Sequence, residues 1–253
     1  MPVTSTKPSP VKTSGLTAKL RIVGAFASLS DDQLRTIEPF FYESKYDKET
    51  VIFYPEQDLP QDNGYRIYFV AEGCVKLVKY SSEGESTIVR LASIGEFFGV
   101  TSALSDSPHP FSAEALTNAS VLSIHVDDFR RITQQYPAIA LDMISAMGKV
   151  LWFNYATHNQ VVKKSEARVA KIILYHLKRD GAADMEDGLQ LKIHLPHDYI
   201  ASMTGIAYEE SVRIISRLKK QHECIQYMRG GRIIITNLSE LRLVAQEQEE
   251  ISF

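Results

Sequence analysis

Residues 196–220, PHDYIASMTGIAYEESVRIISRLKK, are the most specific segment of the chain. The pattern predicts a short helix over 196–203, a tight turn over 204–206 and a second helix over 207–220. Two helices joined by a short turn that contains a glycine have the spacing of a helix-turn-helix. This segment therefore indicates the architecture of the C-terminal part of the chain.

A β-hairpin of the kind called a wing is predicted directly after it, with strands at 224–227 and 233–236 and an Arg-Gly-Gly-Arg turn at 229–232. Basic residues gather here, opposed only by Glu223; they are Arg213, Arg217, Lys219, Lys220, Arg229 and Arg232. Such a cluster can neutralise phosphates, which gives sequence-independent affinity for nucleic acid. A solvated charged surface is the alternative, and the helix-turn-helix spacing favours binding.

Upstream, residues 137–164 predict one long helix that begins after a proline suited to the first turn. Two apolar stripes run along it, so we expect two packing partners: a second copy of the helix and the residues upstream. The predicted dimer interface comprises Met143, Met147, Val150, Leu151, Asn154 and Val161. A lone polar Asn154 on this seam would fix the register of a short coiled coil. A buried helix of a monomer is the alternative.

Further upstream, short runs of alternating or β-branched residues are separated by turn residues. They lie at 51–54, 66–70, 75–80, 87–91, 111–116 and 121–125. This regular spacing predicts an antiparallel barrel or sandwich. Helices are expected at 16–23, at 127–135 and at 238–246. Two more are expected to begin at N-cap residues, one at Ser30 and one at Ser165 that runs to residue 178. A polar loop is expected over 179–188.

The composition is that of an ordinary globular protein of 253 residues, and the formal net charge of −3 excludes a globally basic one. Cys74 and Cys224 lie far apart without a CxxC motif, which fits a reducing cytoplasm. Cys74 is predicted to lie in the core as a thiol. Cys224 lies beside basic residues and is a candidate redox-responsive thiolate. There is no apolar run long enough to span a bilayer and no secretory signal pattern, so we expect a cytoplasmic protein.

Neither a metal nor a haem is expected as a cofactor. The cysteine count excludes an iron–sulfur cluster. His109 and His158 could serve as axial haem ligands, but surface or hydrogen-bonded histidines are the simpler interpretation. His194 and His197 have a spacing seen in metal sites, without an evident third ligand.

Several fragments together resemble the CRP/FNR family of bacterial transcription regulators. They are DKETVIF at 47–53, IYFVAEGCVKL at 67–77, GEFFG at 95–99, the helix at 137–164, IASMTGI at 200–206 and SRL at 216–218. The resemblance implies an α+β fold with an antiparallel, jelly-roll-like β-roll, a long dimerisation helix and a winged helix-turn-helix. It divides the chain into a flexible arm (1–14), a sensor (15–136), the dimerisation helix (137–164) and a DNA-binding domain (165–253).

The resemblance implies a homodimeric, sequence-specific regulator rather than an enzyme. Two recognition helices related by a two-fold axis would read an inverted repeat with half-sites about one helical turn apart. The implied partners are double-stranded DNA, RNA polymerase and a small-molecule effector, with no membrane. No nucleophile–base pair, carboxylate dyad or phosphate loop favours an enzyme. The other alternative is an effector sensor that acts through protein partners with a degenerate DNA reader.

By alignment with the family, the base-reading positions fall on Tyr208, Glu209 and Arg213. Glu209 can orient the guanidinium of Arg213 one turn later, and that guanidinium can bind a guanine edge. Tyr208 stands where the family often has arginine, and Glu210 replaces a small hydroxyl residue, so we expect a different half-site. The full set of predicted DNA contacts is Tyr208, Glu209, Ser211, Arg213, Arg217, Lys219, Arg229 and Arg232.

The β-roll departs from the cyclic-nucleotide-binding members of the family at two positions. Those members carry a glutamate after the Gly-x-Phe-x-Gly stretch and a later Arg-Ser or Arg-Thr pair, whereas this chain has Val100 after Gly99 and Phe111 before Ser112. Without a cation for the phosphate, we expect a neutral or hydrophobic effector other than cAMP, or none. The predicted pocket comprises Gly95, Phe97, Gly99, Val100, Phe111, Ser112, Asn154 and Tyr155.

Overall fold

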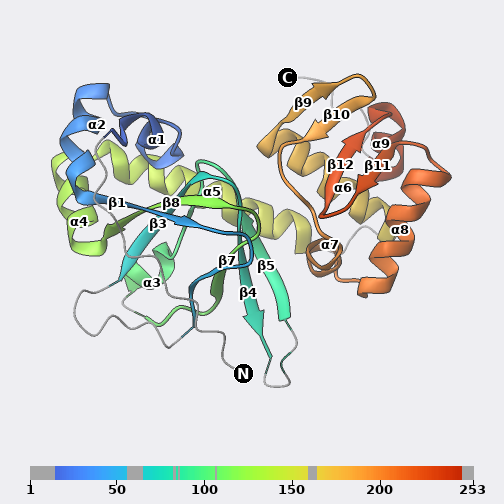
Figure 1. Cartoon of the computed structure of the whole chain (residues 1–253), viewed down its shortest axis with the longest axis horizontal. Coiled ribbons are helices and arrows are strands. Elements are labelled where there is room, and N and C mark those ends of the chain that lie inside the picture. The colour runs from blue at the N-terminus through green and yellow to red at the C-terminus, as the bar shows by residue number, and fades with distance from the viewer. Residues whose placement is uncertain are drawn as a thin grey trace. The chain divides into compact units, whose positions relative to one another are not determined.

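A computed structural model describes residues 15–55, 65–81, 84, 86–105, 107–158 and 164–246, with the side chains of 152–158 left out. The chain forms two compact units, Met1–Leu151 and Trp152–Phe253, which are described separately (Figure 1). The predicted arm at 1–14 and Val161 lie outside the described residues. Within the described part of the chain, no helix is both long and apolar enough to cross a membrane.

The first unit contains two four-stranded antiparallel sheets, ordered β1-β8-β3-β6 and β2-β7-β4-β5 (Figure 1). The strands are β1 (Phe41–Tyr46), β2 (Val51–Phe53), β3 (Arg66–Glu72), β4 (Val75–Tyr80), β5 (Ser86–Ala92), β6 (Phe97–Phe98), β7 (Ser112–Ala115) and β8 (Ala119–His125). The predicted antiparallel β-roll is confirmed. Strands β1 and β6 were not predicted.

Strand β1 escapes a pattern-based prediction because it buries a charge. Glu43 is 8% exposed and lies 2.6 Å from Nζ of Lys19 and 2.5 Å from Oγ of Ser120. The strand forms one edge of its sheet and pairs along its whole length with β8, where Phe41 lies opposite Ile124. A buried carboxylate with an ammonium and a hydroxyl partner is satisfied, although it interrupts the apolar alternation.

Two separate cores hold this unit together. The inner core lies between the two sheets and includes Phe53, Leu77 and Phe98. The outer core lies between the β1-β8-β3-β6 sheet and the helices, where the rings of Phe26 and Phe69 are 5.2 Å apart. The helices are α1 (Thr17–Arg21), the 3-10 turns η1 (Gly24–Phe26) and η2 (Glu38–Phe40), α2 (Asp31–Ile37), α3 (Val100–Ser105), α4 (Val126–Gln135) and α5 (Ala138–His158).

The N-cap prediction for Ser30 is confirmed. Its Oγ accepts from the Gln33 backbone N–H at 3.3 Å, and the Gln33 side chain accepts from the Ser30 N–H at 2.8 Å. Both bonds together form a capping box, which satisfies two amide groups at the start of α2.

The long helix α5 turns a different face inward from the predicted one. Met143 is 3% exposed in the outer core, and Val150 packs against that core. The prediction that Met143 forms the dimer interface is therefore wrong, because it holds the helix against its own unit, whereas the half-buried Val150 keeps its predicted assignment. Leu141 and Ile144, from the other stripe, are 70% and 65% exposed. Of the other predicted interface residues, Met147 and Leu151 are exposed, and the side chain of Asn154 lies outside the described set.

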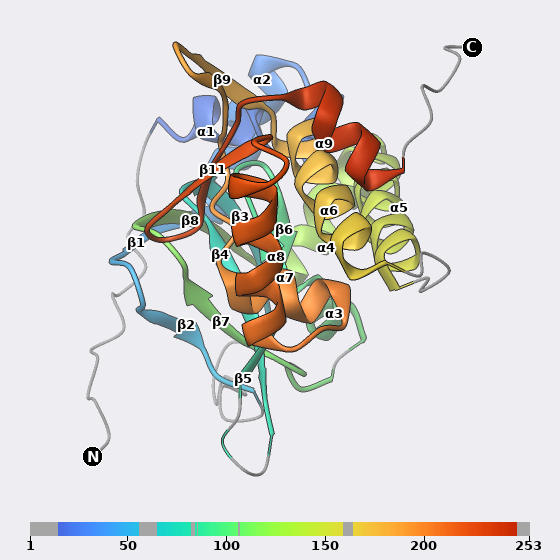
Figure 2. The same ribbon diagram turned by 90° about the vertical axis from the view of Figure 1, so that its right-hand side faces the viewer.

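The second unit packs helices against a four-stranded sheet ordered β11-β12-β10-β9. Its elements are α6 (Ser165–Asp180), β9 (Ala182–Met185), β10 (Gly188–Leu191), α7 (His197–Thr204), α8 (Tyr208–Lys220), β11 (Ile225–Met228), β12 (Arg232–Ile235) and α9 (Leu238–Ala245). Figure 2 shows α9 lying along α6. The predicted loop over 179–188 is wrong, because β10 pairs with β12 and carries β9 as a hairpin. Lys164, not Ser165, is the N-cap of α6.

A buried polar network joins α6 to α7 in this unit. The fully buried His176 contacts Oδ2 of Asp180 through Nδ1 at 2.7 Å and the hydroxyl of Tyr199 through Nε2 at 2.9 Å. Burial raises the pKa of Asp180, but the hydrogen bond from His176 and the charge of Arg179 lower it by more, so the pKa lies below its usual value. The carboxylate therefore stays ionised and fixes the His176 ring, whose contact with Tyr199 joins the two helices.

Candidate nucleic-acid interface

Helices α7 and α8 form the predicted helix-turn-helix. Gly205 ends α7 in the left-handed conformation, with φ 64°, and its N–H reaches the carbonyls of Ala201 and Ser202. Helix α8 begins three residues later and buries one face, formed by Ile214, Ile215 and Leu218, in the core of the unit. Acidic residues in its first turn and basic residues in its last turn complement the helix dipole.

The opposite face of α8 carries four of the predicted DNA contacts. Tyr208 is 53% exposed, and Glu209, Arg213 and Lys219 are also exposed. The sequence reading missed Val212, which is exposed on the same face four residues after Tyr208. The spacing of four residues from Tyr208 places Val212 on the same helix face, and this spacing could have predicted its exposure.

Two other predicted contacts lie elsewhere. Ser211 is fully buried, and its Oγ lies 3.0 Å from the carbonyl oxygen of His197, so the prediction that it contacts DNA is wrong. Arg217 pairs with α6, with its Nε 3.0 Å from Oε1 of Glu166, but its side chain is 41% exposed, so its contact with DNA stays a prediction. Within the described residues, no ion pair joins Glu209 to Arg213.

The wing exposes Arg229, in the turn after β11, and Arg232, the first residue of β12. Two hydrogen bonds fasten this turn to the entry of α7. The Leu195 N–H donates to the carbonyl of Gly231 at 2.7 Å, and the Tyr227 hydroxyl donates to the carbonyl of Leu195 at 3.1 Å. The wing is therefore attached directly to the residues that lead into the helix-turn-helix.

Gly231 is required by this attachment. It has φ +83°, and a Cβ there would lie 2.6 Å from the Leu195 carbonyl carbon. We expect Gly231→Ala to lower the free energy of unfolding of the second unit by about 3 kcal/mol, through left-handed strain and backbone overlap together. Gly230→Ala is the matched control, because Gly230 has the same φ with open space around it and should cost about 1 kcal/mol. Urea denaturation followed by circular dichroism measures both, and equal losses would contradict the overlap.

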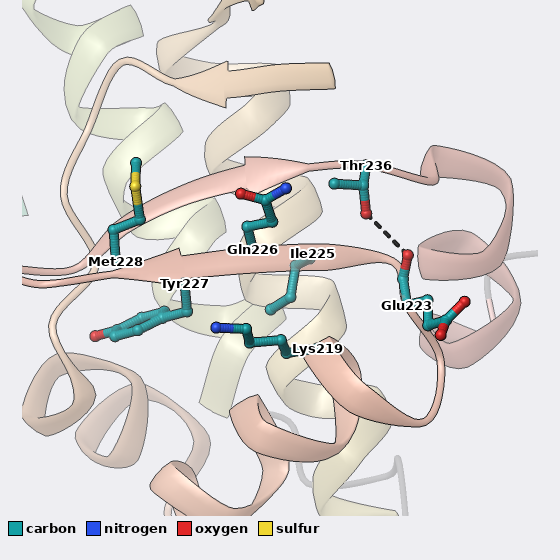
Figure 3. Close-up of a pocket in the computed structure, with 7 residues that line it drawn as sticks. All are labelled: Lys219, Glu223, Ile225, Gln226, Tyr227, Met228 and Thr236. Carbon is teal, nitrogen blue, oxygen red and sulfur yellow. Dashed lines mark hydrogen bonds between the residues drawn. The ribbon is translucent and has the colours of Figure 1, made fainter. Parts of the chain in front are cut away.

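A pocket of about 390 Å³ lies where the C-terminal half of α8 meets the wing. Figure 3 shows Lys219 and Tyr227 between β11 and α8, with Gln226 and Met228 on the other side of the strand. At its far end, the Thr236 hydroxyl donates to the carbonyl of Glu223 at 2.8 Å. The pocket thus borders the basic surface formed by α8 and the wing.

Cys224 sits in the interior rather than on this surface. The thiol is fully buried, with Sγ 3.5 Å from the Leu218 carbonyl oxygen, and burial raises its pKa to about 11. The candidate redox thiolate is therefore corrected to a protonated core thiol. Cys74 is buried as well. In the described ranges, no group of three His, Cys, Asp or Glu side chains could hold a metal ion.

The predicted effector pocket is only partly assembled in the β-roll. Phe97 and Val100 belong to the outer core, so their assignment to the pocket is wrong. Phe111 packs against the inner core, and the Oγ of Ser112 is buried without a hydrogen-bond partner among the described residues. A Cβ on Gly99 would lie 2.9 Å from the Tyr68 ring, so that glycine allows close packing. Gly95 donates to the Val70 carbonyl, and the side chains of Asn154 and Tyr155 lie outside the described set.

Aromatic rings occupy much of the inner space of the roll. The Phe53 ring stacks on His109 at 4.0 Å and lies 5.4 Å from Tyr68, and Tyr68 stacks on Phe98 at 5.1 Å. The sequence reading missed a shielded cation nearby. Arg90 lies 5.5 Å above the Phe97 ring with its Nη2 3.8 Å from Oε1 of Glu96.

Both units match known families. Residues 44–136 match the cyclic nucleotide-binding domain and residues 167–244 the Crp-like helix-turn-helix domain, and together these matches span more than half of the chain. The global nitrogen regulator of Synechocystis sp. is 25% identical over 178 residues, covering 69% of this chain and 76% of the relative. The cyclic AMP receptor protein of Thermus thermophilus is 22% identical over 197 residues, covering 78% and 85%.

A solved structure has the same fold. That of a CooA mutant from Carboxydothermus hydrogenoformans has a TM-score of 0.63 at 17% identity, covering 95% of this chain and all of that one. The order of a cyclic-nucleotide-binding-type β-roll and a Crp-like helix-turn-helix is thus shared along nearly the whole chain. The chain belongs to the CRP/FNR family and is a transcription regulator with a DNA-binding helix-turn-helix domain.

Proposed function

We propose that the protein is a homodimer that binds an inverted repeat in double-stranded DNA and regulates transcription there with RNA polymerase. The observation that carries this proposal is the exposed face of α8. It presents Tyr208, Glu209 and Arg213 on one side of the helix while the wing adds two exposed arginines. A rigid helix with this chemistry fits the major groove, and the wing fits the adjacent phosphates.

Base reading is assigned to Tyr208, Glu209 and Arg213, and phosphate binding to the residues around them. Arg213 can bind the O6 and N7 atoms of guanine with its guanidinium. Lys219, Arg229 and Arg232 carry exposed charges that contribute to affinity at every sequence.

The dimer is proposed to form along the exposed stripe of α5, comprising Leu141, Ile144, Met147 and Leu151. Such a run of large apolar side chains along one helix face is costly to leave in water. Gly148 lies within the stripe, and a Cβ there would meet no atom within 4 Å, so the backbone of a second helix can approach closely. The recognition helices of two chains joined here would be related by a two-fold axis.

Salt dependence tests DNA binding by this surface directly. A fluorescently labelled random duplex would be titrated with the full chain at several salt concentrations, and anisotropy would report the fraction bound. We expect the logarithm of the affinity to fall by about 0.9 for each phosphate neutralised per tenfold rise in salt. A failure to bind at every salt concentration would contradict the proposal and favour action through protein partners.

The β-roll is proposed to respond to an effector other than cAMP, of neutral or hydrophobic character. Phe111 stands where a phosphate-binding arginine is expected by resemblance, and it packs against the inner core. The rings of Phe53, Tyr68 and Phe98 further make this interior apolar. A cyclic phosphate placed there would lose its water without gaining the family's cationic partner.

We therefore expect millimolar cAMP to leave the thermal unfolding midpoint of the full chain unchanged. A ligand that binds only the folded state raises that midpoint in proportion to its occupancy. The measurement is a thermal melt with and without cAMP, with AMP as the control for non-specific nucleotide effects. A rise of several degrees with cAMP alone would contradict the assignment.

A further inference from the structure

His197 occupies the junction of three elements in the second unit. It is the first residue of α7 and lies two residues after Leu195. The wing is fastened to Leu195 by hydrogen bonds from the Leu195 N–H to the Gly231 carbonyl and from the Tyr227 hydroxyl to the Leu195 carbonyl. Any side chain at this point therefore meets α8 and β11 as well as its own helix.

The imidazole of His197 is packed between two tyrosine rings. The Tyr227 ring of β11 lies 4.4 Å away at an interplanar angle of 34°. The Tyr208 ring, at the start of α8, meets it edge-on at 5.9 Å and 75°. Aromatic pairs at these separations have preferred orientations, so each ring restricts the other. The three rings form a ladder from the wing to the first residue of α8.

A hydrogen-bonded contact fixes the same imidazole to the next turn of α8. The buried Oγ of Ser211 lies 3.0 Å from the His197 carbonyl oxygen and 3.3 Å from its Nδ1. The hydroxyl has one hydrogen, which it donates to the carbonyl, so both contacts are satisfied when Nδ1 carries a proton and donates to Oγ. Burial lowers the pKa of His197, which favours the neutral ring, although the nearby Asp198 opposes this.

We infer that His197 is a positioning residue for base recognition, which orients the ring of Tyr208 at the entrance of the recognition helix through the Tyr227–His197–Tyr208 ladder. This inference rests on the proposed DNA binding. Tyr208 is 53% exposed, so one part of its ring is held by His197 while the remainder is available to DNA. An oriented aromatic ring at this position reads the base edge by apolar contact, of which the thymine methyl group is the natural target.

The test is a double-mutant cycle on base selectivity with the full chain. Wild type, His197→Ala, Tyr208→Ala and the double variant would compete for the half-site enriched by the wild type and for each of its single-base variants. We expect His197→Ala to reduce discrimination between bases by about two- to tenfold at the positions that Tyr208→Ala affects. This fold-change corresponds to the contribution of one aromatic pair. In the Tyr208→Ala background it should have no further effect on selectivity.

A rescue variant separates positioning from folding. His197→Phe keeps a flat ring between the two tyrosines and should retain wild-type selectivity, whereas His197→Leu fills the volume without a ring and should behave like His197→Ala. If His197→Ala does not fold, the Phe and Leu variants supply the same comparison. Thermal unfolding midpoints of all variants would be recorded alongside.

The outcomes are distinguishable. A uniform loss of affinity on every duplex from His197→Ala, or an equal loss in the Tyr208→Ala background, would overturn the positioning role while leaving the DNA reader intact. A wild-type protein without any base preference would overturn the proposed sequence-specific binding, and with it any positioning role of His197.

Discussion

Ile144→Glu is expected to convert the dimer into a folded monomer with greatly weakened DNA binding. Ile144 is 65% exposed in the single chain, so the change leaves both cores of its unit intact. In the proposed dimer it would place two carboxylates against an apolar seam, where desolvation of unpaired charge opposes association. A dimer binds both half-sites as one linked unit, whereas two monomers bind them independently. Affinity for an inverted repeat should therefore fall by about 100-fold or more.

Light scattering after size exclusion measures the mass, and anisotropy measures the DNA affinity. Lys149→Glu is the matched control, because Lys149 is an exposed residue of the same helix outside the apolar stripe. We expect this control to remain a dimer. A dimeric Ile144→Glu protein, or a monomer that binds the repeat as tightly as the wild type, would show that α5 does not form the interface.

Arg213→Ala is expected to abolish discrimination at one base pair of each half-site. The side chain is exposed on α8 and has no ion-pair partner in the described residues, so its guanidinium is available to a guanine edge. A bidentate contact of this kind contributes about 1–3 kcal/mol. Affinity for the site with the cognate base should therefore fall by about five- to 100-fold, without a matching loss for sites with another base at that position. Competition among all single-base variants of the site measures this profile.

Lys219→Gln supplies the contrast to Arg213→Ala. Lys219 lies in the last turn of α8 beside the wing, where it is assigned to phosphate rather than to a base. Its substitution should weaken all duplexes alike and reduce the magnitude of the salt slope by about one unit. Equal and sequence-independent effects from both substitutions would exclude Arg213 as a base reader.

The helix-turn-helix was predictable because its signals are local. A glycine in the turn and apolar residues at helical spacing define α7 and α8 within a residue of their observed ends. The buried Ser211 was misassigned because its position depends on His197, and the ion pair of Arg217 was not predicted because Glu166 also comes from another element. Contacts between distant residues leave no periodic trace in the sequence.

The two apolar stripes of α5 show a second limit of sequence patterns. Both stripes of α5 are apolar, and the periodicity does not say which one faces the β-roll. The structure decides it, because Met143 fits the outer core and Leu141 remains in water. The hairpin β9–β10 was missed for a related reason. Its strands are short, with β9 mostly exposed and β10 half-buried, and they are held in the sheet by pairing of β10 with β12 and of β9 with β10 rather than by their own alternation.

Selection of random duplex DNA by the full chain at moderate salt, followed by sequencing of the retained molecules, tests the central claim most directly. We predict enrichment of an inverted repeat whose half-sites are about one helical turn apart, since two copies of α8 related by a two-fold axis would enter successive major grooves. Enrichment of single half-sites without a fixed partner would contradict the dimer, and the absence of any enriched sequence would contradict sequence-specific recognition by α8.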